Sequence, residues 1–186
     1  TACAVAQGLA FAARPEGVPV LPLDTLWAVA ETARAELAAS GQAMPQIIAA
    51  VLDARMDEVY VVTYLLQDQK LMAQDAPRLC RPEDLHLAVP AVAGTLLAGN
   101  AAAVYGKRFA PALRALPQVP SLPTAAALLR LAPAALAQGL AVVAAEAQPL
   151  YVRDKVAQTT AERERLRLEQ LVRLSVPVSA VSPLDA

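Results

Sequence analysis

The order of apolar and polar positions predicts two helices at the start of the chain. Residues 2–13 are apolar with Gln7 as the main exception, and an Arg-Pro pair follows, so we expect a short helix that ends there. A second helix is expected over 26–39. Asp24 or Thr25 can cap its N-terminus, and a Ser-Gly pair follows its last turn.

Apolar runs then predict a sheet. Residues 46–53 are almost continuously apolar, and residues 58–66 are rich in Val, Tyr and Thr, which favour strands. The link between them is 54–57. We expect 70–74 to add a third, short strand to this antiparallel meander. A further strand is expected at 95–98.

The rest of the chain alternates between short helices and extended pieces. A small helix is expected at 82–89, and a helical segment at 101–109 follows a Gly-Asn pair. Residues 111–123 carry four prolines and are expected to be mostly extended, whereas a capping threonine opens a helix over 124–138. At 160–174 the charges alternate in sign, which predicts a solvated helix.

Composition narrows the function classes. The chain has 186 residues, 56% of them apolar, which is enough for a buried core. Its net charge is −1, and it contains one Trp, four Tyr and two Phe. It lacks the basic footprint and the aromatic platform of a protein that binds nucleic acid by itself, although a partner can supply the charge.

The cysteines and the histidine argue against metal chemistry. Cys3, Cys80 and His86 are the only residues of these two types, and neither a CxxC nor an HExxH motif is present. We therefore expect no zinc site. Two lone cysteines favour reduced thiols and a cytoplasmic protein, with one structural disulfide as the less favoured alternative.

One uncharged stretch has the length of a membrane span. Residues 87–106 carry no Asp, Glu, Lys or Arg. However, Pro90, Gly94, Gly99 and Asn100 interrupt them, and breakers at this density are typical of several buried segments. We expect no membrane association.

The acid-rich stretch LDARMDEVY is the first candidate for chemistry. Asp53, Asp57 and Glu58 could pair as a general acid and base. A hairpin that turns at a water-exposed edge also needs polar residues, and Asp and Arg suit such a turn. We favour the turn, because a hairpin tip lacks the burial that shifts a carboxyl pKa.

Three weaker signals have structural explanations. His86 lies between two leucines of the helix expected at 82–89, and the sequence shows no nucleophile or acid that would pair with it. The segment LAGNAAAVYG could form a phosphate cradle at a helix start, but a tight turn explains it as well. Ser121 lacks the Gly-x-Ser-x-Gly context of a nucleophile elbow.

The order of five segments is more specific than any single motif. AQGLAFA, VPVLPLDTLWAVA, AAVLDARMDEVYVVTY, LLAGNAAAVYG and AQPLYVRDKVA follow one another over residues 2–157, and together they resemble the bacterial TsaB (YeaZ) family. The resemblance implies an α/β chain of the actin-like, sugar-kinase-like ATPase fold, which has two RNase H-like lobes. We expect a remnant of the first lobe at 1–43, the second lobe at 44–157, and a charged helix with a loose tail at 158–186.

One departure from the family concerns the first lobe. Chains of the family begin with a strand and an Asp-Thr-Ser-like turn, and they carry a Gly-Pro-Gly-x-Phe-Thr-Gly-x-Arg stretch before the AQGLA helix. Neither feature is present here. We therefore expect a chain that lacks most of the first lobe.

The resemblance implies that this chain acts as a partner subunit in tRNA modification. A TsaB protein is a non-catalytic scaffold subunit that binds a TsaD-like paralogue and a TsaE-like ATPase in the formation of threonylcarbamoyl adenosine at position 37 of tRNA. It implies no catalytic, cofactor or metal residue in this chain. ATP or ADP and a metal are expected on the TsaD-like partner, and tRNA is reached only through the complex. The alternatives are an ATP-dependent enzyme of the actin-like superfamily and a glycoprotease-like peptidase, which is the family's old label.

The first helix is the candidate contact with a partner. It is apolar on nearly every side, so it needs cover from other surfaces. In the resembling family the equivalent helix contributes to the contact with TsaD or with a second TsaB, and we expect a homodimer here. The candidate interface residues are Ala2, Cys3, Ala6, Gln7, Leu9, Ala10 and Ala13.

Overall fold

The computed structural model describes residues 1–13, 15–91 and 93–153. Its contacts divide the chain into two units, Thr1–Val152 and Arg153–Ala186. The description below concerns the first unit. The charged helix expected at 160–174 and the domain boundary expected at residue 157 lie outside the described residues, so both remain predictions.

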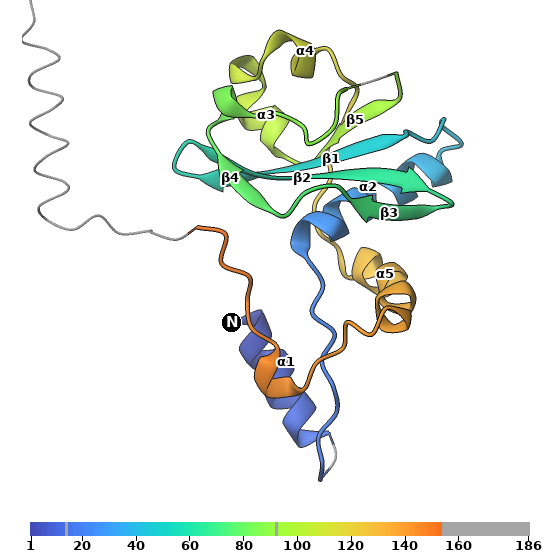
Figure 1. The fold of residues 1–186 in the computed structure, drawn as a ribbon, viewed down its shortest axis with the longest axis vertical. Coiled ribbons are helices and arrows are strands. Elements are labelled where there is room, and N and C mark those ends of the chain that lie inside the picture. Colours follow the sequence, from blue (N-terminus) through green and yellow to red (C-terminus); the bar gives the residue numbers. More distant parts are fainter. Residues whose placement is uncertain (14, 92, 154–186) are drawn as a thin grey trace, which may run out of the picture. The chain divides into compact units, whose positions relative to one another are not determined.

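A mixed sheet forms the centre of the first unit (Figure 1). Its order is β3-β2-β1-β5-β6, with β4 also paired to β2. β1 runs antiparallel to β2 and parallel to β5, which in turn pairs in parallel with β6. The strands are β1 Ile47–Arg55, β2 Glu58–Gln67, β3 Lys70–Ala73, β4 Arg78–Cys80, β5 Thr95–Ala98 and β6 Gln118–Val119. The expected antiparallel meander is confirmed, whereas β4 was not expected.

Helices cover both faces of this sheet, with α2 on one side and α3 and α4 on the other (Figure 1). The α-helices are α1 Ala2–Ala12, α2 Thr25–Ala39, α3 Ala101–Tyr105, α4 Pro111–Arg114 and α5 Ala125–Ala137. The 3₁₀ helices are η1 Pro82–Asp84, η2 Gly106–Arg108 and η3 Ala144–Glu146. Both expected caps are present: Asp24 accepts hydrogen bonds from the first turn of α2, and Thr124 accepts one from the first turn of α5.

The position of β1 explains its continuous apolar run. Ile48 and Ala50 pack on the α2 side of the sheet, and Ala49 and Val51 pack on the side of α3 and α4. Because successive side chains of a strand point to opposite faces, a strand that is buried on both faces needs apolar residues throughout. Burial of a side chain such as Ile48 stabilises the fold by about 1.5–3 kcal/mol.

Two expected elements differ in the structure. The helix expected at 82–89 is wrong: only η1 is helical, and residues 85–91 form a strap without regular secondary structure that bends at 88 and 89. Two backbone groups of the strap form hydrogen bonds with side chains from elsewhere in the fold. Arg78 donates to the carbonyl oxygen of His86, and the Ala88 amide donates to Thr63 Oγ1 at 3.1 Å. The segment 111–123 begins with the short helix α4 before it becomes extended, because Pro suits the first turn of a helix.

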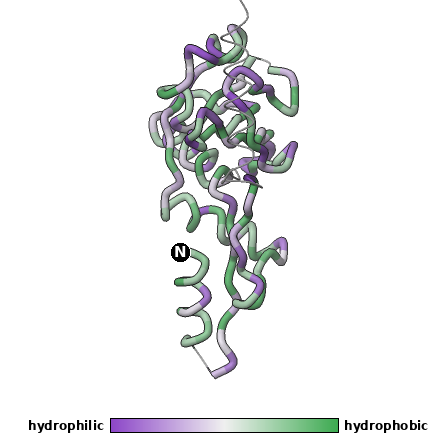
Figure 2. Tube along the Cα trace, turned by 90° about the vertical axis from the view of Figure 1, so that its left-hand side faces the viewer, coloured by the Kyte–Doolittle hydropathy of each residue, from purple (hydrophilic) through white to green (hydrophobic). Residues whose placement is uncertain are grey.

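The helix α1 is joined to the rest of the unit by few contacts. It packs against η3, and the Val18 amide donates to the carbonyl oxygen of Ala10 at 3.0 Å. An antiparallel bridge pairs Val20 with Val142. Figure 2 shows that α1 is apolar along most of its length. No described helix is long and apolar enough to cross a lipid bilayer.

Candidate functional site

The acid-rich segment is the β1–β2 hairpin, as the sequence predicted. The turn follows a bulge between Asp53 and Arg55. Three consecutive residues, Arg55, Met56 and Asp57, have φ angles of 60°, 54° and 60°. This left-handed conformation is unfavourable for L-residues, and least so for Asn and Asp, so other contacts must hold Arg55 and Met56 in it.

Asp53 provides the first of these contacts. Its Oδ1 accepts a hydrogen bond from the Arg55 amide at 2.7 Å and another from the Tyr105 hydroxyl at 3.0 Å. The Asp53 amide donates to Asn100 Oδ1 at 2.9 Å. Burial raises the pKa of the Tyr105 phenol, and the hydrogen bond to Asp53 raises it further, so the phenol remains the donor.

The corner after β5 brings Asn100 to this position. Gly99 has a φ of 127°, and a Cβ on it would lie 2.0 Å from the Val51 carbonyl oxygen. Only glycine therefore allows the chain to pass so close to β1 and then to start α3. The Gly-Asn pair is a tight turn that ties two parallel strands together at their carboxyl ends.

Arg108 is the second contact that holds the hairpin. Its NH1 donates to Asp57 Oδ1 at 2.9 Å, and its Nε and NH2 donate to the two Glu83 oxygens at 2.5 Å and 3.2 Å. Its guanidinium carbon lies 5.5 Å from the centre of the Tyr105 ring. The pKa of the Glu83 carboxyl is lowered chiefly because Arg108 donates to it.

Asn100, Tyr105, Arg108 and Glu83 hold the hairpin through Asp53 and Asp57, and we call this group of side chains the brace. Its geometry fits a structural role better than an acid–base pair. Asp53 already accepts two hydrogen bonds, and Asp57 is paired with Arg108 although its side chain is 76% exposed. Among the residues that the structure describes, no three His, Cys, Asp or Glu side chains gather into a set that could hold a metal ion.

The other candidates from the sequence lie apart from this brace. His86 is exposed in the strap, where its Nδ1 lies 3.0 Å from the Asp84 carbonyl oxygen, so the amphipathic helix expected around it is wrong. Ser121 is buried, and its hydroxyl donates to the Val119 carbonyl oxygen at 3.4 Å. Cys3 and Cys80 are free thiols, and burial raises the pKa of Cys80.

The candidate interface residues differ in how much of α1 they leave open. Ala2, Leu9 and Ala13 are exposed, Cys3, Ala6 and Gln7 are half-buried, and Ala10 is buried within the chain. Val5 and Phe11, which the candidate set leaves out, are 56% and 61% exposed, and Leu9 is 68% exposed. The size of Val5 and Phe11 could have identified them from the sequence as interface candidates, because only large apolar side chains contribute much area to a contact.

Sequence reasoning missed the brace residues Asn100, Tyr105, Arg108 and Glu83. Arg108 meets partners 25 and 51 positions away, and Tyr105 meets one 52 positions away. A single charged or aromatic residue carries no local signal of such a partner, so only the fold could show them.

Known proteins resemble the chain over most of its length. A family model described as TsaD, tRNA N6-adenosine threonylcarbamoyltransferase, matches residues 1–179. The solved structure described as YeaZ from Pseudomonas aeruginosa is 35% identical with a TM-score of 0.70, and the match covers 81% of this chain and 66% of that one. A second structure, described as an uncharacterized protein with similarity to peptidase YEAZ from Pseudomonas aeruginosa, is 36% identical with a TM-score of 0.69 over 82% and 66% of the two chains. No functionally curated protein gave a significant match. The chain thus spans 66% of the length of either solved relative.

Proposed function

From the premise that this chain belongs to the TsaD family and, within it, to the TsaB (YeaZ) proteins, we propose that it is a non-catalytic scaffold subunit in the formation of threonylcarbamoyl adenosine at position 37 of tRNA. It binds a TsaD-like paralogue, and a TsaE-like ATPase joins them. The actin-like fold that the family implies agrees with the mixed sheet and its helices.

The open apolar face of α1 carries this proposal. The helix has eleven residues and only Ala10 is buried, while Val5, Leu9 and Phe11 each expose more than half of their surface. It contains no charged residue. Three large apolar side chains on one uncharged helix are typical of a surface that another protein covers.

The brace at the hairpin supports the non-catalytic part of the proposal. The carboxylates of Asp53, Asp57 and Glu83 are all engaged with Tyr105 or Arg108, so they serve the fold. On this proposal the TsaD-like partner binds the ATP or ADP and the metal, and it performs the transfer. tRNA is reached through the complex in the cytoplasm.

Without the paralogue, the same face of α1 pairs with a second copy of the chain. A homodimer and the heteromeric complex then compete for Val5, Leu9 and Phe11. The TsaD-like partner should therefore convert a dimer of this chain into a mixed complex, which light scattering on the separated species can detect.

The test places a charge in the proposed contact. Leu9→Arg and Val5→Arg alter exposed positions, whereas arginine at buried Ala10 would disturb the chain itself. Each should weaken binding to the TsaD-like paralogue by at least about tenfold, because the interface would bury an unpaired charge. Threonylcarbamoyl adenosine formation in the reconstituted system should fall in parallel.

Leu129→Arg is the matched control, because Leu129 on α5 is 74% exposed and belongs to no part of α1. It should leave binding and modification unchanged. Full complex formation by Leu9→Arg and Val5→Arg would show that α1 is not the contact.

A further inference from the structure

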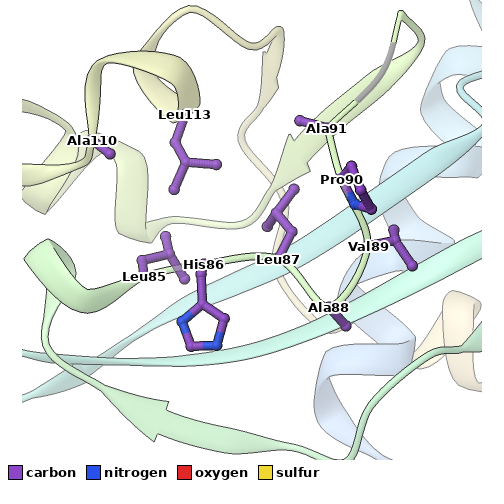
Figure 3. A pocket seen from close by; sticks show the side chains of 9 residues that line it. All are labelled: Leu85, His86, Leu87, Ala88, Val89, Pro90, Ala91, Ala110 and Leu113. Carbon is purple, nitrogen blue, oxygen red and sulfur yellow. The ribbon is translucent and has the colours of Figure 1, made fainter.

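A second apolar surface lies between the strap and α4. The groove there has a volume of about 400 Å³. Figure 3 shows Leu113 of α4 and Leu85 and Leu87 of the strap pointing toward the same space. Leu85 and Leu113 are 4% and 6% exposed and form its floor. The lining residues are Leu85, His86, Leu87, Ala88, Val89, Pro90, Ala91, Ala110 and Leu113.

The groove is held in place by the hydrogen bonds that fix the strap to the sheet. The Ala88 amide is fixed by Thr63 Oγ1, and Arg78 donates to the carbonyl oxygen of His86 while pairing with Asp75 at 3.2 Å. Floor residues Leu85 and Leu113 belong to the same buried cluster as β1 and α3. A surface that is already ordered loses little entropy when a ligand binds.

The charged residues of η2 and α4, which adjoin the groove residues Ala110 and Leu113 in sequence, are all basic. Residues 106–114 contain Lys107, Arg108 and Arg114 and no carboxylate, and residues 85–145 contain neither Asp nor Glu. Arg108 is engaged with Glu83 and Asp57. Lys107 and Arg114 are exposed, and each lies within three positions of a lining residue.

The aliphatic lining and the exposed cations indicate which kind of ligand the groove can bind. RNA bases would need exposed aromatic rings to stack on, but Phe109 and Tyr105 are buried at 2% and 9% exposure. A symmetric contact with a second copy would bring these basic residues against their own counterparts. An aliphatic floor beside exposed cations instead complements a polypeptide that has apolar side chains flanked by carboxylates.

We propose that the groove between the strap and α4 binds a short acidic segment of a partner protein. One or two apolar side chains of the segment pack against the more accessible lining residues Leu87, Val89 and Ala91, above the buried floor, and its carboxylates lie beside Lys107 and Arg114. Asp84, the last residue of η1, directly precedes the lining residue Leu85, and its charge opposes an acidic segment at that end of the groove. No residue of α1 takes part, so this site and the proposed TsaD contact can fail independently.

The test uses fluorescence polarisation of the intact chain with labelled synthetic peptides. The probe is a short peptide of leucine and glutamate, and its two comparison peptides replace either all glutamates by lysine or all leucines by serine. We expect saturable binding of the Leu/Glu peptide and much weaker binding of both comparison peptides.

Reversing the charges of Lys107 and Arg114 is the variant that tests the proposal most directly. The double variant Lys107→Glu, Arg114→Glu should lower the affinity for the Leu/Glu peptide by at least about fivefold, because two exposed ion pairs are lost and replaced by repulsion. The same variant should bind the Leu/Lys peptide better than the unaltered chain does, which a misfolded variant could not do. Lys70→Glu, an exposed reversal on β3, should change neither affinity.

Several results would overturn the proposal. Absence of saturable Leu/Glu binding would do so, as would equal weakening by Lys70→Glu. A single-stranded RNA oligomer that binds through Lys107 and Arg114 when the peptide does not would reassign the surface to RNA. Loss of self-association in the double variant, again without peptide binding, would reassign it to a second copy.

Discussion

At the scale of single residues, the corner after β5 requires glycine at position 99, because the backbone of Val51 leaves no room for a side chain. Gly99 passes so close to Val51 that no other residue fits. Asn100 can then reach the Asp53 amide, and Asp53 in turn accepts from Tyr105. Asp53, which the sequence offers as half of an acid–base pair, therefore helps to close a turn that the glycine makes possible.

Gly99→Ala tests this steric requirement. A Cβ 2.0 Å from the Val51 carbonyl oxygen forces β1 and β5 apart, so we expect the free energy of unfolding to fall by about 2–4 kcal/mol. Gly8→Ala is the matched control, because nothing lies within 4 Å of its Cβ position in α1. It should be neutral or stabilise the fold by up to about 1 kcal/mol. Urea denaturation measures both, and equal stability of the two variants would contradict the close approach.

At the scale of elements, Arg108 joins three segments that are distant in sequence. It lies at the end of η2, pairs with Glu83 in η1 and with Asp57 in the hairpin, and contacts the Tyr105 ring of α3. Because bidentate guanidinium–carboxylate pairs fix geometry as well as charge, these contacts hold the left-handed hairpin tip against η1 and η2.

The Arg108–Glu83 pair predicts a dependence of stability on pH. The pKa of Glu83 in the folded chain lies below its ordinary value of 4.5, because Arg108 donates to the ionised carboxylate. A lowered folded-state pKa contributes stability above pH 4.5, and this contribution is lost as the pH falls through the folded-state pKa. Glu83→Gln should therefore be less stable than the parent chain at neutral pH, and the difference should shrink in acid.

Urea denaturation at a series of pH values measures that difference. Asp84→Asn is the control, because Asp84 is the neighbouring carboxylate and no ion pair is described for it. Its difference from the parent should vary less with pH. A gap between Glu83→Gln and the parent that stays constant from neutral to acid pH would show that the ion pair does not stabilise the hairpin.

At the scale of the whole molecule, two apolar surfaces belong to different parts of the chain. One is the exposed face of α1, beside η3, and the other is the groove beside α4. The acidic residues between the strands are engaged within the chain. A molecule whose hairpin carboxylates are engaged within the chain and whose apolar faces are open is suited to assembly with other proteins.

We therefore expect the purified chain to hydrolyse neither ATP nor peptides. Phosphate release and cleavage of labelled peptides should match the buffer blank, since the described polar residues form no paired nucleophile and base. Turnover that disappears in Asp53→Asn or Asp57→Asn would overturn the scaffold proposal and assign the chemistry to the hairpin.

The sequence by itself determined the elements whose signals are local, and with them the family. The apolar run of β1, the Val and Thr content of β2 and the caps Asp24 and Thr124 predicted strands and helices that the structure confirms. The family and the actin-like fold followed from the order of segments, and the family model and the YeaZ structures confirm them.

Only the tertiary structure decided the strap, β4 and the partners of Arg108. The helix expected at 82–89 does not form. The Ala88 amide, which a helix would direct to the Asp84 carbonyl oxygen, donates instead to Thr63 Oγ1, and Arg78 donates to the His86 carbonyl oxygen. Arg108 could not be assigned a role, because its partners lie 25 and 51 positions away. Hydrophobic periodicity reports on neighbours within a few residues, whereas a hydrogen bond or ion pair across the fold depends on how whole elements pack.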